Sequence, residues 1–133
     1  MSELIFIDTS AWYAYVNSKD PNHQLISNLM HRLKGDLVTS NYVFDEILTL
    51  VRMRMGHSVA VEVGEALLNP KNVFMERVTA KDERHAWQLF SARKDQSYSY
   101  TDCTSFIIMK RMGIKQALTL DKHFCTEGFC IVR

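Results

Sequence analysis

"LIFIDTSAWYAYV", residues 4–16, is the stretch that indicates the fold most directly. Its first four residues form a continuous apolar run, which is typical of a strand buried on both faces of a parallel sheet. The run ends abruptly at Asp8, and two hydroxyl residues, Thr9 and Ser10, open an aromatic-rich segment that we expect to be helical over residues 10–17. Asp8 can cap that helix, or it can hold a ligand that requires negative charge.

The size and composition of the chain predict one domain spanning residues 1–133. The chain has 133 residues, of which 47% are hydrophobic, and a formal net charge of +1. So small a charge gives no strong global field for a polyanion, and nucleic acid would have to be bound through a local patch or a metal. No apolar run reaches the length of a membrane span, and the three cysteines form no CxxC pair. We therefore expect a soluble, cytoplasmic protein with reduced thiols and no membrane association.

Short apolar runs alternate with longer helical patterns along the whole chain. The expected strands are residues 4–7, 37–40, 73–78, 115–120 and a last strand within 129–133. The expected helices are residues 10–17, a segment that starts at Pro21 after a capping Asp20 and ends at Gly35, residues 41–55, 58–68, 79–93 and 101–112, and a turn or short helix at 121–124. This alternation predicts an α/β fold with a mostly parallel sheet between layers of helices. Right-handed crossovers then bring the carboxyl ends of the strands to one edge, where such sheets bind ligands.

Acidic residues occur at points that this topology would bring to that edge. Asp8 follows the first strand, and Asp121 follows "ALTL". Asp102 precedes the apolar run 106–109 and belongs to the first turn of its helix, where the helix dipole favours a carboxylate. Each of the three can simply cap a helix, but a helix start also directs a carboxylate toward the strand ends, so both roles can hold at once.

The helix expected over residues 41–55 contributes a fourth acid. At about 100° per residue its apolar side chains centre near Ile47, which turns Asp45 toward water. Glu46 falls at the flank of the apolar stripe, so it is the acid of this pair that is directed to the sheet edge. Glu46 can be a site residue, or it can be a boundary glutamate that extends into solvent.

Four converging carboxylates without a cation would repel one another, and some would take up protons. A divalent ion resolves this repulsion, and ligands that are all oxygen favour Mg²⁺ or Mn²⁺. Such an ion can lower the pKa of a bound water and stabilise charge on a phosphate. Thr9, Ser10 and Thr101 adjoin the acids and can orient metal-bound water.

Several short motifs, taken in this order and spacing, resemble the PIN-domain nucleases and, within them, the VapC-type toxins of toxin–antitoxin pairs. They are "FIDTS" (6–10), the "TS…E" of residues 39–46, "SYTD" (99–102), "LTLDKHF" (118–124) and "GFCIV" (128–132). The resemblance spans residues 5–132. It implies a PIN-like three-layer α/β/α fold with a five-stranded parallel sheet, and a metal-dependent endoribonuclease. It places the acidic constellation of the family on Asp8, Glu46, Asp102 and Asp121.

The resemblance also carries expectations about the surroundings of the acids. The small hydroxyl that the family keeps near the metal falls on Thr9 or Ser10, with Ser40 and Thr101 as further candidates. It implies an RNA substrate, a homodimer, and a cognate antitoxin whose C-terminal tail enters the active-site groove. The middle segment "RMRMGHSVAVEVGEALLNP" (52–70) carries little of the family pattern, so no contacts can be transferred to it.

A few residues outside the acids are candidate RNA contacts. Arg52, Arg93 and Lys94 can hold phosphates, and Tyr100 borders the expected site. The alternative for Arg52 is an ordinary solvated helix face, which the pattern favours. His123 can contact RNA or metal, but we interpret it as a structural turn residue whose ring hydrogen-bonds to the backbone.

Other classes of protein share parts of this pattern. A housekeeping PIN nuclease and a non-catalytic scaffold that binds RNA or protein stay open, although the intact acids argue against the scaffold. A phospho-acceptor receiver domain needs an acidic pair after its first strand, whereas here Thr9 follows Asp8. A DNA flap-type nuclease carries additional elements that grip a duplex, and this chain is too short to hold them.

Overall fold

A five-stranded sheet forms the middle of the molecule in the computed structural model, which describes residues 3–33 and 35–133. The strands are β1 (Leu4–Ile7), β2 (Asp36–Ser40), β3 (Phe74–Glu76), β4 (Gln116–Leu118) and β5 (Cys130–Ile131), in the order β3-β2-β1-β4-β5. β1 is central, with Phe6 opposite Val38 of β2 and Ala117 of β4. The expectation of a mostly parallel sheet is confirmed, since every one of these strand pairs is parallel.

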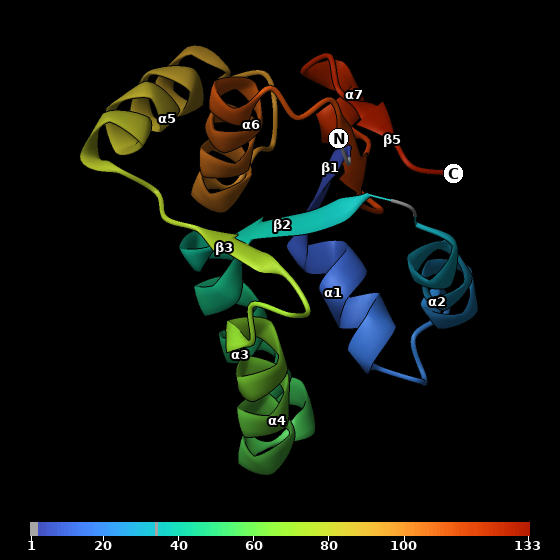
Figure 1. Cartoon of the computed structure of the whole chain (residues 1–133). Coiled ribbons are helices and arrows are strands. Elements are labelled where there is room, and N and C mark those ends of the chain that lie inside the picture. Colours follow the sequence, from blue (N-terminus) through green and yellow to red (C-terminus); the bar gives the residue numbers. More distant parts are fainter. Residues whose placement is uncertain (1–2, 34) are drawn as a thin grey trace.

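Helices cover both faces of this sheet. Over the described residues they are α1 (Thr9–Val16), α2 (His23–Arg32), α3 (Asn41–Met55), α4 (His57–Leu68), α5 (Ala80–Ala92), α6 (Tyr100–Met112) and α7 (His123–Thr126). α1 and α2 lie on one side of the sheet and α5 and α6 on the other, and α3 and α4 form a pair near the β3 end (Figure 1). The three-layer α/β/α architecture is therefore confirmed. None of the described helices combines the length and apolar character needed to cross a membrane.

The apolar run of β1 is buried because it lies at the centre of the sheet, between the helix layers. Ile5, Phe6 and Ile7 are at most 3% exposed. They belong to one apolar cluster with Phe106 of α6, which packs edge-on against Phe124 of α7 with ring centroids 4.9 Å apart. β1, which ends at Ile7 directly before Asp8, is consequently held by close packing on both of its faces.

Polar caps set the start of the two helices that carry candidate site residues. Ser40 caps α3 by accepting a hydrogen bond from the Val43 amide, at 3.1 Å. Ser99 and Asp102 form a reciprocal capping box that starts α6. Gly113 ends α6 with a φ of 70°, a left-handed conformation that glycine adopts without strain.

Several element boundaries differ from the sequence-based expectation. α2 begins at His23, not at Pro21, because the Asp20 carboxylate accepts a hydrogen bond from the Asn22 amide (2.8 Å) and stabilises a turn before the helix. α2 also ends at Arg32, ahead of Gly35. β3 and β5 are shorter than expected, and β4 ends at Leu118 rather than at residue 120. The residues after Leu118 instead form a turn that contributes to the site described next.

Candidate active site

The carboxyl ends of β1 and β4 lie side by side, and the residues that follow them form part of a cavity. The two chain segments are tied together, since the Asp8 amide donates a hydrogen bond to the Leu118 carbonyl at 3.1 Å. The cavity has a volume of about 660 Å³ and is lined by residues from both strand ends, from α1, from α3 and from the start of α6. It lies at the edge of the sheet where the topology predicts a ligand site.

All four predicted acids and all three predicted hydroxyl residues line this cavity. They are Asp8, Glu46, Asp102 and Asp121, with Thr9, Ser10 and Thr101; Asp45, Thr49, Leu50 and Met53 complete the lining. The helical arrangement expected for α3 is largely confirmed, because Asp45 is exposed and Glu46 is half-buried. Asp45 nevertheless borders the cavity, which the expectation that it faces bulk water did not include.

Asp8 occupies the position that precedes α1, but its side chain accepts no capping hydrogen bond within the described chain. The Ser10 and Thr119 hydroxyls instead both donate to the same oxygen, Oδ2, at 2.8 and 2.9 Å. Asp8 is only 4% exposed. Burial raises the pKa of the Asp8 carboxyl, while the bonds from Ser10, Thr119 and the Thr9 backbone lower it and the charge of Asp121 raises it further, with a net upward shift.

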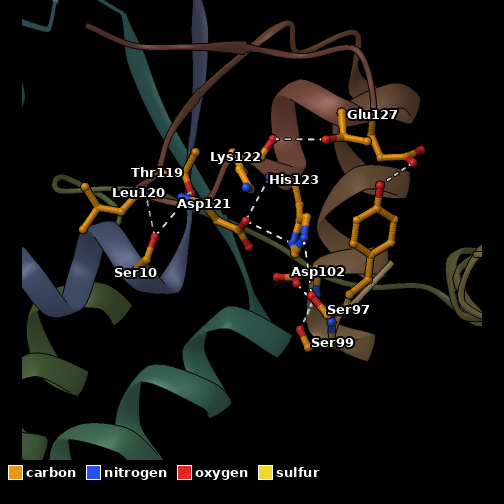
Figure 2. Close-up of polar contacts among 12 residues, drawn as sticks. Ser10, Ser97, Ser99, Asp102, Thr119, Leu120, Asp121, Lys122, His123 and Glu127 are labelled. Carbon is orange, nitrogen blue, oxygen red and sulfur yellow. Dashed lines mark hydrogen bonds and ion pairs between the residues drawn. The ribbon is translucent and has the colours of Figure 1, made fainter. Parts of the chain in front are cut away.

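Thr119 is a residue of this site that sequence reasoning missed. Its hydroxyl lies 3.2 Å from the Ser10 hydroxyl and accepts a hydrogen bond from the Asp121 amide at 2.9 Å. Ser10 in turn accepts from the Leu120 amide at 3.0 Å, so the two hydroxyls fasten the 119–121 turn to the end of β1 (Figure 2). A polar residue in "ALTLD", between an apolar run and the acid, was the signal that could have identified Thr119.

Asp102 caps its helix and lines the cavity at once, as the sequence allowed. Its Oδ2 accepts from the Ser99 amide and its own amide donates to the Ser99 hydroxyl, both at 3.0 Å. Burial raises the pKa of Asp102 to about 6; the Ser99 bond acts against this shift, and the charges of Asp8, Asp121 and Glu46 add to it. The carboxylates from separate segments are therefore close enough to influence one another.

His123 lies closer to the acids than its interpretation as a turn residue implied. Its amide donates to Asp121 Oδ1 at 2.9 Å, which is the turn contact, but its ring Nδ1 also lies 3.0 Å from the same oxygen. The interpretation is wrong for the ring, which contacts a carboxylate rather than the backbone. Potential ligand atoms of Asp102, Asp121 and His123 all lie within 4.8 Å of one another (Figure 2).

The cavity wall combines excess negative charge with an unused hydroxyl. No lysine or arginine is among its described lining residues. The Thr9 hydroxyl is buried and finds no hydrogen-bond partner among the residues that the structure describes. Buried polar atoms are normally paired, so this one is free for water or another ligand. The donor set is thus carboxylate and hydroxyl oxygen with one imidazole nitrogen, a set that suits Mg²⁺ or Mn²⁺.

The four candidate RNA contacts lie outside this cavity as the described residues define it. Arg52 is exposed and lines a groove between α3 and α4. Arg93 forms an ion pair with Glu127 at 3.1 Å, and Lys94 is exposed beside it. The Tyr100 hydroxyl donates to the Glu83 carbonyl at 3.0 Å. Their roles toward RNA remain predictions.

Comparison with known proteins gives consistent family relationships. The model of the PIN domain family matches residues 5–127 of the chain. The chain is 37% identical over 130 residues to the 23S rRNA-specific endonuclease VapC20 of Mycobacterium tuberculosis, with 98% of each chain covered. It is 29% identical over 121 residues to Ribonuclease VapC26 of the same organism, covering 90% of this chain and 89% of the relative.

Solved structures show the same architecture. The crystal structure of VapC20, described as a sarcin–ricin loop cleaving toxin, has a TM-score of 0.89 at 36% identity and covers 94% of this chain and 95% of its own. The DNA-bound VapBC structure from Salmonella typhimurium has a TM-score of 0.69 at 15% identity and covers 98% and 97%. The second match, at this low identity, supports the fold alone.

Proposed function

Since this chain belongs to the VapC-type ribonucleases of the PIN-domain family, we propose that its four clustered carboxylates hold Mg²⁺ or Mn²⁺ and that it cleaves RNA as the toxin of a toxin–antitoxin pair. One observation carries the proposal: acids from four separate segments of the chain line a single cavity that has no lysine or arginine among its described lining residues. Burial and mutual repulsion raise the pKa of both Asp8 and Asp102. A divalent cation would remove the cost of holding these charges together.

The proposed ligands are Asp8, Glu46, Asp102 and Asp121, with the His123 ring close enough to join them. Such an ion, when bound, supplies a water of lowered pKa and stabilises negative charge on a phosphate. Thr9, Ser10 and Thr101 are proposed to orient water at the cavity wall. Thr9 is the best supported, because its hydroxyl has no hydrogen-bond partner among the described residues.

The protein's own contribution is to fix the carboxylates in place before substrate arrives. Ser10 and Thr119 both donate to Asp8 Oδ2, and no hydroxyl of the described residues donates to Oδ1. The capping box fixes Asp102, and the amide of His123 fixes Asp121. Ligands held by such surrounding bonds need little reorganisation when charge develops on the substrate.

The proposed partners follow from the relatives. VapC20 is named as an endonuclease specific for 23S rRNA, and the Salmonella typhimurium structure is a VapBC assembly. We propose RNA as the substrate of this chain, a cognate antitoxin as its inhibitor and a homodimer as its assembly. The expected location is the cytoplasm, where such an RNA substrate is found.

Cleavage of an RNA hairpin with the 23S rRNA sarcin–ricin loop sequence, by the purified chain, tests the proposal. We expect cleavage with Mg²⁺ or Mn²⁺ and none with EDTA. Asp8→Asn should abolish most of the activity, because it removes a charged ligand while it keeps the size of the side chain. Asp36→Asn is the matched control. Asp36 is exposed at the start of β2, whereas the cavity lies at the carboxyl ends of the strands. Equal cleavage by wild type and Asp8→Asn would overturn the assigned site.

A further inference from the structure

Helix α5 carries two large aromatic side chains in water. Trp87 is 60% exposed and Phe90 is 40% exposed, and their rings are near parallel, with centroids 6.1 Å apart and planes at 25°. The buried face of the same helix is formed by other residues, including Ala86, which is fully buried. Phe90 also packs edge-on against Tyr100, with ring centroids 6.1 Å apart, but neither Trp87 nor Phe90 belongs to the core cluster of the described residues. Exposed apolar surface of this kind commonly marks a binding site.

The two rings border a hollow of about 360 Å³ at the end of α5. Arg93, Lys94 and Gln96 line it as well, together with the hydroxyl residues Ser91 and Tyr98. The volume falls in the range of small-molecule sites, which is about 300–1,000 Å³. The hollow thus combines flat apolar faces with two cationic groups and an amide that can both donate and accept hydrogen bonds.

The charge around the hollow is arranged for an anion. No acid is among the described residues that line it, although Asp95 lies next in sequence to Lys94. Arg93 donates from Nε to Glu127 Oε2 at 3.1 Å, and the Glu127 side chain is 4% exposed, so its charge is directed inward. This contact uses Nε alone and fixes the guanidinium, which leaves the two Nη groups for a phosphate.

One short loop connects the hollow to the acidic cavity. Gln96 lines the hollow, and in the next residue, Ser97, the hydroxyl lies 3.5 Å from the His123 Nε2. Ser99, two residues further, caps α6 beside Asp102 (Figure 2). An extended polynucleotide that has a phosphate at the carboxylates can therefore continue across this loop to α5.

We propose that the α5 hollow, formed by Trp87, Phe90, Arg93, Lys94 and Gln96, binds an unpaired nucleobase of the RNA substrate. The base stacks on the Trp87 and Phe90 rings, and Arg93 and Lys94 hold its phosphate. Aromatic faces with adjacent cations are the usual platform for single-stranded RNA. The described lining holds two cations and no acid, and only Arg93 is paired with an acid, Glu127, in the part of the chain that the structure describes; this favours RNA over a second copy of this near-neutral chain. The inference takes its ligand class from the proposed function, but it concerns binding and not cleavage.

Binding can be measured without cleavage, in buffer that contains EDTA, with a short, unstructured, fluorescently labelled oligoribonucleotide. The chain has two tryptophans, and Trp12 is buried and bonded to Thr39, so quenching on RNA addition would report on Trp87. By fluorescence anisotropy, Trp87→Ala should lower affinity about 5- to 150-fold, the range for loss of one base–aromatic stack, while Trp87→Phe should retain most of it. Phe74→Ala, which removes an exposed ring on β3, is the matched control and should bind as wild type does.

The cationic part of the hollow has its own readout. Lys94→Ala should reduce the slope of log affinity against log salt by about 0.7, the value for one phosphate contact on a single strand. Lys71→Ala removes another exposed lysine, in the loop before β3, and should leave this slope unchanged. An unchanged slope for Lys94→Ala would contradict the phosphate contact.

Several results would overturn the inference. One is equal affinity of wild type and Trp87→Ala, and another is no RNA binding by wild type in EDTA. If light scattering shows that Trp87→Ala converts a dimer into a monomer with RNA affinity unchanged, the surface belongs to a second copy. Failure of the proposed function would look different, because RNA would bind through Trp87 in EDTA and remain uncut after Mn²⁺ is added.

Discussion

Replacement of Arg111 by alanine is the sharpest test of how the α5–α6 layer is held. The Arg111 guanidinium donates from Nε and Nη2 to the two oxygens of Asp82, at 2.9 and 2.8 Å, and from Nη1 to Glu76 at 2.7 Å. One side chain on α6 thereby joins the start of α5 to the end of β3. Asp82 is 2% exposed, so Arg111→Ala leaves a buried carboxylate without its cation.

The magnitude follows from this burial. Removal of one partner from a buried ion pair costs about 3–5 kcal/mol, and because 37% of the Arg111 side chain is exposed, we expect about 2–3 kcal/mol. Urea unfolding at pH 7, followed by circular dichroism, measures this loss. Arg84→Ala is the matched control, since Arg84 is an exposed arginine on α5, and its change should stay within about 0.5 kcal/mol.

The loss should depend on pH in a defined direction. Burial raises the pKa of Asp82, but the hydrogen bonds and charge of Arg111, together with the Thr79 cap, lower it further, so the net shift is downward. The stability that Asp82 contributes is therefore present above its unfolded pKa of about 3.9 and is lost as pH falls through its lower folded value. The difference between wild type and Arg111→Ala should therefore hold from pH 7 to about pH 4 and shrink as pH falls further. A difference below about 1 kcal/mol at pH 7, or one that stays constant below about pH 4, would refute this reasoning.

Three further changes test the site and its supports. Thr119→Val removes a hydroxyl that donates to Asp8, and it should weaken Mn²⁺ binding about 10- to 100-fold by calorimetry; unchanged affinity would contradict the supporting role. Ser99→Ala removes half of the capping box, and it should cost about 1 kcal/mol in urea unfolding. It should also weaken Mn²⁺ binding, because Asp102 loses its fixed position, and a stability loss alone would assign the box a purely structural role. Gly113→Ala, at a φ of 70°, should cost about 1 kcal/mol with metal affinity unchanged, and equal stability would argue against a left-handed end of α6.

The fold was predictable from the chain because local patterns and topology agree. The apolar run 4–7 requires burial on both faces, and only a central strand between helix layers provides it. The placement of Glu46 followed from helix geometry alone, since α3 is long and strongly patterned. Boundaries such as Pro21 were harder, because Asp20 can support either a turn or a helix start and the sequence does not show which.

Two parts of the site escaped prediction for a common physical reason. Thr119 acts through a contact between segments that are far apart in sequence, and the His123 ring acts through its orientation. The sequence places both residues near Asp121 but does not show which group each one contacts. The Thr119 hydroxyl meets Asp8 across 111 positions. The sequence position of His123 predicted a turn residue, and its amide does make the turn contact. Its ring, however, contacts the Asp121 carboxylate. The α5 hollow was not predicted either, because the sequence pattern of α5 does not show which of its aromatic side chains are exposed.

The central position of β1 has a consequence for the order in which the nuclease matures during synthesis. β1 leaves the ribosome first, yet one of its two neighbours, β4, is made more than a hundred residues later. Asp8 acquires its bonds to Leu118 and Thr119 only then. A nascent chain therefore carries an unfinished set of carboxylates for nearly the whole time of translation, and the ribosome that makes this RNA-cleaving enzyme is not exposed to a complete active site until synthesis is almost over.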